Sequence, residues 1–141
     1  YLQFEINKIF QCLSVEPLNF CEWAHRSYGV DKNNIYETIQ SIKCYQKINS
    51  PDSLISRYFT EDIPTGLVPI ISLAKYFNIE TPTIDSIIHL ANVICSRNFF
   101  IEGRTIEKLN LISYIQKRVE VISRNVYDQY QPLEEEQLVS G

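Results

Sequence analysis

Apolar residues recur at intervals of three and four along most of this chain, and that spacing limits the folds available to it. The first fourteen residues show the pattern, with Leu2, Ile6, Ile9 and Leu13 on one stripe of a helix. Only four glycines and six prolines interrupt the chain, too few for the many turns of a β-sandwich. The sequence therefore predicts an all-α fold, and its 141 residues suit a single domain.

Residues that favour helix ends divide the first part of the chain into segments. Pro17 suits the first turn of a second helix, and Gly29 is placed to end that helix. Asn33 or Asn34 can cap a third helix. The run from 49 to 52 (NSPD) indicates a turn before the next segment.

The second half of the chain contains the most apolar helix. Residues 67–77 (LVPIISLAKYF) are apolar around most of a helical circumference, so we expect this helix to be the most buried. Pro69 should start or kink it. Thr81 and Pro82 suit an N-cap and first-turn pair, opening a helix that reaches Ile94.

The chain is expected to end in a long helix and a tail. The helix runs from Leu111 to about Tyr130, and residues 131–141, with their acidic run, form a solvated tail. A break at Gly103 and Arg104 precedes this helix. Its structural interpretation is a helix end followed by a turn capped by Thr105. Its functional interpretation is that Arg104 supports a site from a second loop or contacts another domain.

The stretch 57–69 (RYFTEDIPTGLVP) combines an arginine, two carboxylates and two prolines. A short helix is expected to lead into it from Leu54. On one continuous α-helix Arg57 and Asp62, five residues apart, would lie about 140° apart. Pro64 disfavours the α conformation at the residue before it, so we expect the chain to change direction here and Asp62 to cap the next helix.

Two interpretations of this stretch stay open on the residues alone. In the structural one, Asp62 is only a helix cap, and Arg57 is an exposed or ion-paired residue. In the functional one, the planar guanidinium of Arg57 binds a substrate carboxylate, and Asp62 accepts the Nδ1 proton of a histidine. The chain's own histidines, His25 and His89, are expected to be ordinary core or surface residues. A catalytic histidine would have to come from outside this chain.

Composition and motifs argue against several classes of protein. A net charge of −4 offers no basic stripe for nucleic acid. No apolar run approaches the roughly 20 residues of a membrane span, and the start does not resemble a signal peptide. The histidines and cysteines show no metal-ligand spacing, and no GxGxxG or P-loop motif is present to cradle a phosphate.

Cysteine and methionine usage indicates the protein's setting. We expect the cysteines to be reduced core residues of a cytoplasmic protein. They are Cys12, Cys21, Cys44 and Cys95. The chain has no methionine, so we expect that it does not begin at a translation start and is a piece of a longer protein.

Three segments together resemble one known family. The stretch 57–69 closely resembles the signature of the opine dehydrogenases, the octopine/nopaline dehydrogenase group. Residues 79–88 (IETPTIDSII) and 103–109 (GRTIEKL) resemble the family's next two elements, in the family's order and at compatible spacing. Upstream of residue 50 the resemblance is only a helical pattern, and it fades past about residue 118.

The resemblance implies a fold and a reaction. Residues 1–130 would be an all-helical C-terminal domain, of the type found at the C-terminus of 6-phosphogluconate dehydrogenase. An N-terminal Rossmann domain, absent from this chain, would bind NAD or NADP. The family condenses an amino acid with a 2-oxo acid and reduces the imine by hydride transfer.

The resemblance also implies roles for individual residues. Asp62 would be the partner of the catalytic histidine, and Arg57 would hold a substrate carboxylate. Thr60 and Glu61 would shape the substrate site. Tyr58, Phe59, Thr65 and Asn110 differ from the family's commonest residues, which puts the substrate in doubt but not the reaction class.

The implied partners follow from the same resemblance. They are the chain's own Rossmann domain and small-molecule substrates, with no nucleic acid or membrane, and a homodimer stays open. The chain alone would be inactive. The alternative is a non-catalytic helical interaction module derived from such an enzyme.

Overall fold

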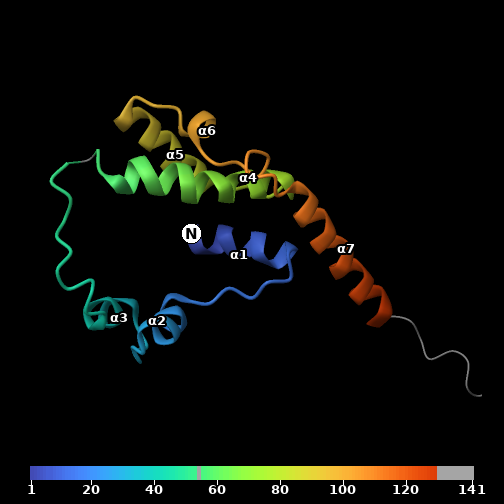
Figure 1. The fold of residues 1–141 in the computed structure, drawn as a ribbon, viewed down its shortest axis with the longest axis horizontal. Helices are drawn as coiled ribbons and strands as arrows, with labels where there is room; N and C mark the ends of the chain where they lie inside the picture. The colour runs from blue at the N-terminus through green and yellow to red at the C-terminus, as the bar shows by residue number, and fades with distance from the viewer. Residues whose placement is uncertain (54, 130–141) are drawn as a thin grey trace, which may run out of the picture.

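Helices and their connections make up the whole of the described chain, residues 1–53 and 55–129 of a computed structural model, with no β-strand among them (Figure 1). The all-α fold is therefore confirmed. In chain order the elements are α1 (Leu2–Cys12), α2 (Phe20–Tyr28), α3 (Ile35–Ser41), the π-helix η1 (Tyr58–Leu67), α4 (Val68–Tyr76), α5 (Pro82–Cys95), α6 (Phe99–Glu102) and α7 (Ile112–Gln129).

Side-chain caps explain where the early helices begin. α2 begins at Phe20 and not at Pro17, because Asn19 and Glu22 form a reciprocal capping box. The Asn19 side chain accepts the Glu22 N–H at 3.0 Å, and the Glu22 carboxylate accepts the Asn19 N–H at 2.9 Å. As predicted, Gly29 ends α2 in the left-handed conformation (φ +67°), and Asn34 caps α3.

The central segment is one continuous helix, so the predicted change of direction before Pro64 is wrong. η1 runs through Pro64 and passes directly into α4, and Leu67 at the junction has helical dihedral angles (φ −72°, ψ −35°). Asp62 therefore lies inside a helix and does not cap the next one. Residues 55 and 56 form no separate short helix, and Leu54, its expected start, lies outside the described residues.

A wider helical turn allows the helix to include Pro64. In an α-helix the proline ring would clash with the carbonyl four residues earlier, which belongs to Thr60. A π-helix joins each N–H to the carbonyl five residues back, and its wider turn relieves that clash. The Val68 N–H shows this pattern by donating to the Ile63 carbonyl. Pro69 lies in the first turn of α4, as predicted.

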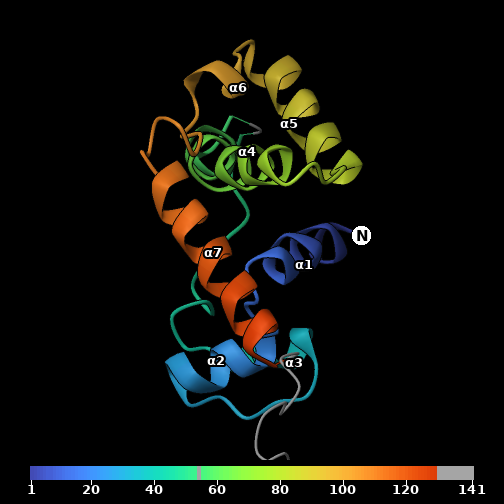
Figure 2. The same ribbon diagram turned by 90° about the vertical axis from the view of Figure 1, so that its right-hand side faces the viewer.

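The helix formed by η1 and α4 lies at the centre of the core. In Figures 1 and 2, α1 lies on one side of it, and α5 and α6 lie on the other. A fully buried Val, Ile or Phe side chain contributes roughly 1.5–3 kcal/mol, so the buried cluster is the main source of stability. Its members are Ile63, Val68, Ile71, Ile84, Ile88, Ala91 and Phe99.

A buried carboxylate from α1 caps α5. Glu5 is 5% exposed, and its carboxylate oxygens accept the N–H groups of Thr83 at 2.8 Å and Ile84 at 3.0 Å. Pro82 opens α5 as predicted, but the Thr81 side chain makes no capping hydrogen bond. Burial raises the pKa of Glu5, and the hydrogen bonds from Thr83 and Ile84 lower it by more, so the net pKa lies below its ordinary value.

The α2–α3 pair and α7 lie away from this core (Figures 1 and 2). α7 begins at Ile112, one residue after the predicted start, and Arg118 of α7 donates to the carbonyls of Leu13 and Ser14. The predicted tail lies outside the described residues, so the tail and the division at residue 130 stay predictions.

All four cysteines are free thiols, but they are less buried than predicted. Cys12 and Cys44 are exposed, and Cys21 and Cys95 are half-buried. The expectation of core cysteines is therefore wrong for the exposed pair. Cys12 ends a short helix at the edge of the core, and Cys44 follows α3 in a turn, where little chain is available to cover them.

We predict that Glu5→Gln lowers the free energy of unfolding by about 1–3 kcal/mol at pH 7, because an amide presents one acceptor where the carboxylate presents two. Since the folded-state pKa of Glu5 is lowered, its contribution is present above the ordinary glutamate pKa of about 4.3. The contribution is lost as the pH falls through the lower folded-state pKa.

Urea denaturation at several pH values measures this difference, with Glu16→Gln as the matched control. Glu16 is exposed and lies outside any helix, so its replacement removes the same charge without removing a cap. Equal stabilities of the two variants at pH 7 would show that Glu5 does not cap α5.

Candidate functional site

The predicted site residues lie at the beginning of η1. Arg57 occupies the N-cap position, and Thr60, Glu61 and Asp62 follow in the first turns. The Arg57 guanidinium donates to the Glu61 carboxylate at 3.0 Å, with the two side chains 75% and 58% exposed. An exposed pair four residues apart contributes only about 0.3–0.5 kcal/mol. Another carboxylate can therefore replace Glu61 on Arg57 at little cost.

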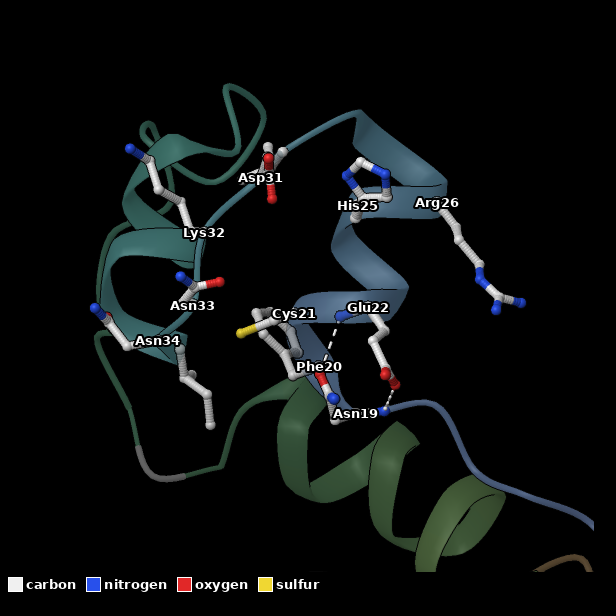
Figure 3. Close-up of a pocket in the computed structure, with 12 residues that line it drawn as sticks. Asn19, Phe20, Cys21, Glu22, His25, Arg26, Asp31, Lys32, Asn33 and Asn34 are labelled. Atoms are coloured by element: carbon white, nitrogen blue, oxygen red, sulfur yellow. Dashed lines mark hydrogen bonds between the residues drawn. The ribbon is translucent and has the colours of Figure 1, made fainter.

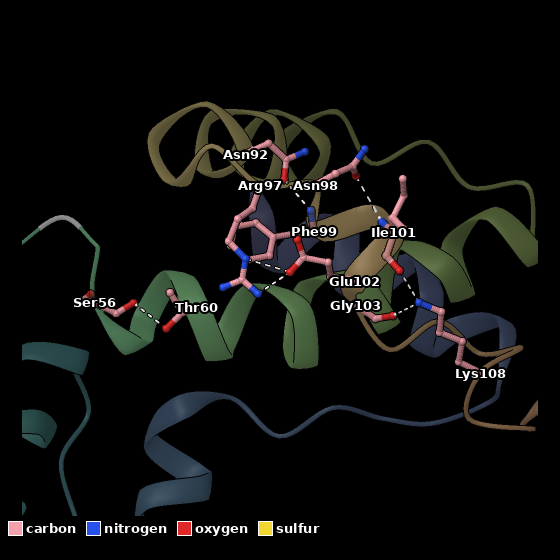
Figure 4. A network of polar contacts seen from close by, with 10 residues as sticks. All are labelled: Ser56, Thr60, Asn92, Arg97, Asn98, Phe99, Ile101, Glu102, Gly103 and Lys108. Carbon is pink, nitrogen blue, oxygen red and sulfur yellow. Dashed lines mark hydrogen bonds and ion pairs between the residues drawn. The ribbon is translucent and has the colours of Figure 1, made fainter.

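The Thr60 side chain is bonded to the backbone of its own helix. Its hydroxyl donates to the Ser56 carbonyl at 3.2 Å, and Figure 4 shows these two residues side by side at the start of the helix. Thr65 makes the equivalent bond to the Glu61 carbonyl at 2.7 Å. Both hydroxyl donors are therefore engaged, and Thr60 has only acceptor capacity left for a ligand.

The Asp62 carboxylate is available to a donor from outside the described chain. Asp62 is exposed, and α4 begins without a side-chain cap, so the structural interpretation of Asp62 as a cap is wrong. Within the described residues the ion pairs join Arg57 with Glu61 and Arg97 with Glu102, which leaves Asp62 unpaired. An exposed, unpaired carboxylate can accept the N–H of an imidazole.

The π-helical form of η1 changes the relation between Arg57 and Asp62 that the sequence led us to expect. In a π-helix, residues five apart are joined by a backbone hydrogen bond and so lie one turn apart on the same side. In an α-helix the same two positions would be about 140° apart. The two residues can therefore face one cleft without the change of direction that we expected.

Neither histidine lies on η1. His25 is exposed on α2, and His89 is exposed on α5, where its ring centroid lies 5.2 Å from that of Phe100. Both are surface residues, one of the two ordinary roles predicted for them.

The loop after α6 contacts the centre of η1. The Arg104 N–H donates to the Pro64 carbonyl at 2.9 Å, while the Arg104 side chain is exposed. Gly103 is buried, and Lys108 Nζ donates to its carbonyl at 3.1 Å (Figure 4). Thr105 begins a single helical turn, as predicted, with the Leu109 N–H bonded to its carbonyl at 3.0 Å.

A second set of polar contacts holds α6 and the loop in place. Arg97 and Glu102 form an ion pair, and the hydrogen bond from Arg97 lowers the pKa of Glu102 (Figure 4). The Asn92 side chain accepts the Phe99 N–H at 2.8 Å, and Ser72 Oγ accepts the Ile106 N–H at 3.0 Å. Sequence reasoning missed these contacts, because each joins residues from different helices or turns.

A wide hollow of about 850 Å³ opens between α2 and α3, away from η1 (Figure 3). His25 and Arg26 line it, but no residue of the 57–69 stretch does. Asn19, Glu22 and Asn34 at its edge are already engaged as helix caps. The size of this hollow alone therefore does not make it a better candidate site than the polar groups of η1.

The described residues contain neither a membrane-spanning helix nor a metal-binding cluster. No helix there is long and apolar enough to cross a membrane. No group of three or more His, Cys, Asp or Glu residues is arranged there to hold a metal ion.

Comparison with known proteins assigns the chain to a family. Residues 2–95 match the model of the family described as NAD/NADP octopine/nopaline dehydrogenase, alpha-helical domain. This chain belongs to that family. The match begins in α1 and ends with α5, so the family resemblance extends further upstream than residue 50, where the sequence showed only a helical pattern.

Curated relatives agree with this assignment. An opine dehydrogenase of Arthrobacter sp. (strain 1C) is 44% identical over 91 residues, which cover 64% of this chain and 25% of the relative. The protein ocs of Agrobacterium vitis is 26% identical over 73% of this chain and 29% of its own length. The vitopine synthase of Allorhizobium ampelinum is 24% identical over 74% of this chain and 29% of its own length. The chain thus spans about a quarter to three tenths of these relatives.

We predict that Glu61→Gln changes the free energy of unfolding by less than about 0.5 kcal/mol, because its pair with Arg57 is exposed. Glu102→Gln should be more destabilising, since Arg97 donates to Glu102 through two nitrogens and that pair is less exposed. Thermal or urea unfolding of both variants measures the contrast. A larger loss for Glu61→Gln would mean that Arg57 is held too firmly to exchange partners.

Proposed function

We propose that this chain is the substrate-binding domain of an NAD(P)H-dependent oxidoreductase of the opine dehydrogenase type, which joins an amino acid to a 2-oxo acid by reductive condensation. The family match over residues 2–95 carries the proposal. The exposed Arg57 and Asp62, one turn apart on η1, supply the groups that such a reaction needs from this domain.

Arg57 is the proposed carboxylate clamp. Both substrates of the reaction carry a carboxylate, and a guanidinium can hold one through two parallel N–H···O bonds. Its bond to Glu61 keeps Arg57 oriented until a substrate carboxylate displaces Glu61. Thr60 and Glu61 form the adjacent wall, where the Glu61 carboxylate can also attract the amino group of the amino acid.

Asp62 is the proposed partner of a histidine supplied by the rest of the polypeptide. By accepting the Nδ1 proton, its carboxylate would fix the imidazole tautomer and raise the imidazole's proton affinity. The histidine can then give a proton to the carbonyl oxygen that leaves as water when the imine forms. Asp62 is available for this role because it neither caps a helix nor pairs with a described cation.

The nicotinamide cofactor would supply the hydride, and the chain's own residues do not form a binding site for it. The sequence has no GxGxxG motif, and its four glycines are isolated, so no run of backbone N–H groups can hold a pyrophosphate. We therefore assign NAD or NADP to a Rossmann domain elsewhere in the polypeptide, in a cytoplasmic enzyme. A homodimer is compatible with this assignment.

A non-catalytic helical interaction module is the second candidate. Large apolar side chains lie exposed on the peripheral helices, including Trp23, Tyr36 and Tyr114, and such surface can bind another protein. The two candidates differ in an assay of the whole polypeptide with NADH or NADPH and a panel of amino acids and 2-oxo acids. Cofactor oxidation that requires both substrates supports the enzyme, and unchanged cofactor fluorescence across the panel supports the module.

We predict that Asp62→Asn lowers kcat of the whole polypeptide at least 100-fold, on the order of what removing the orienting carboxylate costs in other histidine dyads. Stability should be almost unchanged, since Asp62 is exposed and not a cap. Asp52→Asn removes an equivalent charge from an exposed turn and is the matched control. A wild-type kcat in Asp62→Asn would eliminate the proposed role.

We predict that Arg57→Lys raises KM for one of the two substrates about tenfold, because lysine cannot reproduce the bidentate geometry. Arg26→Lys, in the hollow between α2 and α3, is the control and should leave both KM values unchanged. The reverse result, with KM altered only in Arg26→Lys, would move the substrate site to that hollow.

A further inference from the structure

The π-helical pattern of η1 implies that the Pro64 carbonyl lacks a donor five residues along its own helix. In the π-helical pattern each carbonyl accepts the N–H five residues later, as the Ile63 carbonyl does from Val68. The next carbonyl, that of Pro64, would need an N–H at position 69. Pro69 has none. Because Pro64 is buried, its carbonyl would be left without a hydrogen-bond donor, and this would lower the stability of the helix.

The loop after α6 supplies the missing donor. The Arg104 N–H reaches the Pro64 carbonyl at 2.9 Å, from a residue forty positions later in the chain. The residue before it, Gly103, has extended dihedral angles (φ −69°, ψ 169°) that direct the following N–H toward η1. The contact therefore depends on the backbone of Arg104, since the Arg104 side chain points to solvent as an exposed group.

Only glycine fits at position 103. A Cβ atom there would lie 2.6 Å from Val68 Cγ1 and 2.7 Å from the Phe99 carbonyl oxygen. The conflict is steric and not conformational, because φ is negative. At Gly66, on the helix itself, a Cβ would meet nothing within 4 Å. The close approach of the loop is thus specific to Gly103.

The π-helical turn matters because it sets the relative positions of Arg57 and Asp62. If η1 relaxed to α-helical bonding, these residues would move from one turn apart on the same side to about 140° apart. The Pro64 ring opposes that relaxation because it would clash in an α-helix. The loop after α6 opposes it because the Arg104 N–H binds the Pro64 carbonyl, which would otherwise have no donor in the π-helix.

We propose that Gly103 and the backbone of Arg104 are positioning residues: by supplying the donor that Pro69 lacks, they hold η1 in its π-helical form and so keep Arg57 and Asp62 on one side of the helix. The consequence for catalysis rests on the proposed function, whereas the hydrogen bond that holds the helix does not. Arg104 would then support the site through its N–H group and not through its side chain.

The test compares three variants of the whole polypeptide. Arg104→Pro removes the N–H, and the extended Gly103 before it already has the conformation that precedes a proline. Arg104→Ala removes the guanidinium and keeps the N–H. Pro69→Ala, added to Arg104→Pro, gives the Pro64 carbonyl a new donor five residues along its own helix.

Hydrogen exchange is measured over residues 58–68, together with kcat and KM. Arg104→Pro should exchange at least tenfold faster than Arg104→Ala there and should have a kcat about tenfold lower. The added Pro69→Ala should restore both toward the Arg104→Ala values, which a general loss of stability would not allow.

Two results would overturn the proposal: equal exchange in Arg104→Pro and Arg104→Ala, or no recovery in the double variant. Gly103→Ala against Gly66→Ala repeats the exchange comparison without a new proline, and equal exchange in that pair would also overturn it. If the unaltered polypeptide oxidises no cofactor, the proposed function fails, and the exchange measurements alone decide whether the loop holds the helix.

Discussion

The two prolines of the central helix, Pro64 and Pro69, lie five residues apart and determine how that helix is built. Pro64 excludes ordinary α-helical geometry over the preceding turn, and a π-helix accommodates it. Pro69 then leaves one carbonyl without a donor, and a loop from the far side of α6 provides one. The rings of Pro64 and Pro69 thus determine that the loop after α6 must contact η1. The core cluster around Ile63 and Val68 forms at that contact.

The charged side chains at the candidate site are weakly held, so they can change partners and contribute little to stability. The firmer polar contacts lie in the α6 region and its loop, where Arg97 binds Glu102 and Lys108 donates to backbone carbonyls. On η1 itself, Arg57 has a weak partner and Asp62 has none among the described residues. A rigid support beneath loosely engaged charged groups suits the substrate-binding role proposed for this surface.

Local signals in the sequence were enough for the fold class, most helix positions and several caps. Asn34, Gly29 and Pro82 act within a few residues of themselves, so their roles could be predicted. The contacts that the sequence did not predict share a different cause. The Glu5 cap and the Arg104 contact each depend on a partner far along the chain, and no pattern of nearby residues reports such a partner.

The backbone of the candidate site was not predicted. The residue types in the 57–69 stretch left open both a helix cap and a carboxylate clamp with a histidine partner, and local rules gave the wrong backbone. A proline usually ends a helix, and that rule fails where packing on both sides makes a wider turn the better solution. Periodicity could not reveal this, because the cost of the wider turn is offset by contacts from α5, α6 and their loop.

The cap of α5 by Glu5 has a consequence for the order in which the domain assembles. Glu5 and Thr83 are 78 residues apart, whereas η1, α4, α5 and α6 follow one another closely and can pack as they form. During synthesis, α1 is made before α5, so the α5 backbone that Glu5 caps does not yet exist when α1 forms. The first helix of this chain to be translated is thus among the last to reach its place in the core.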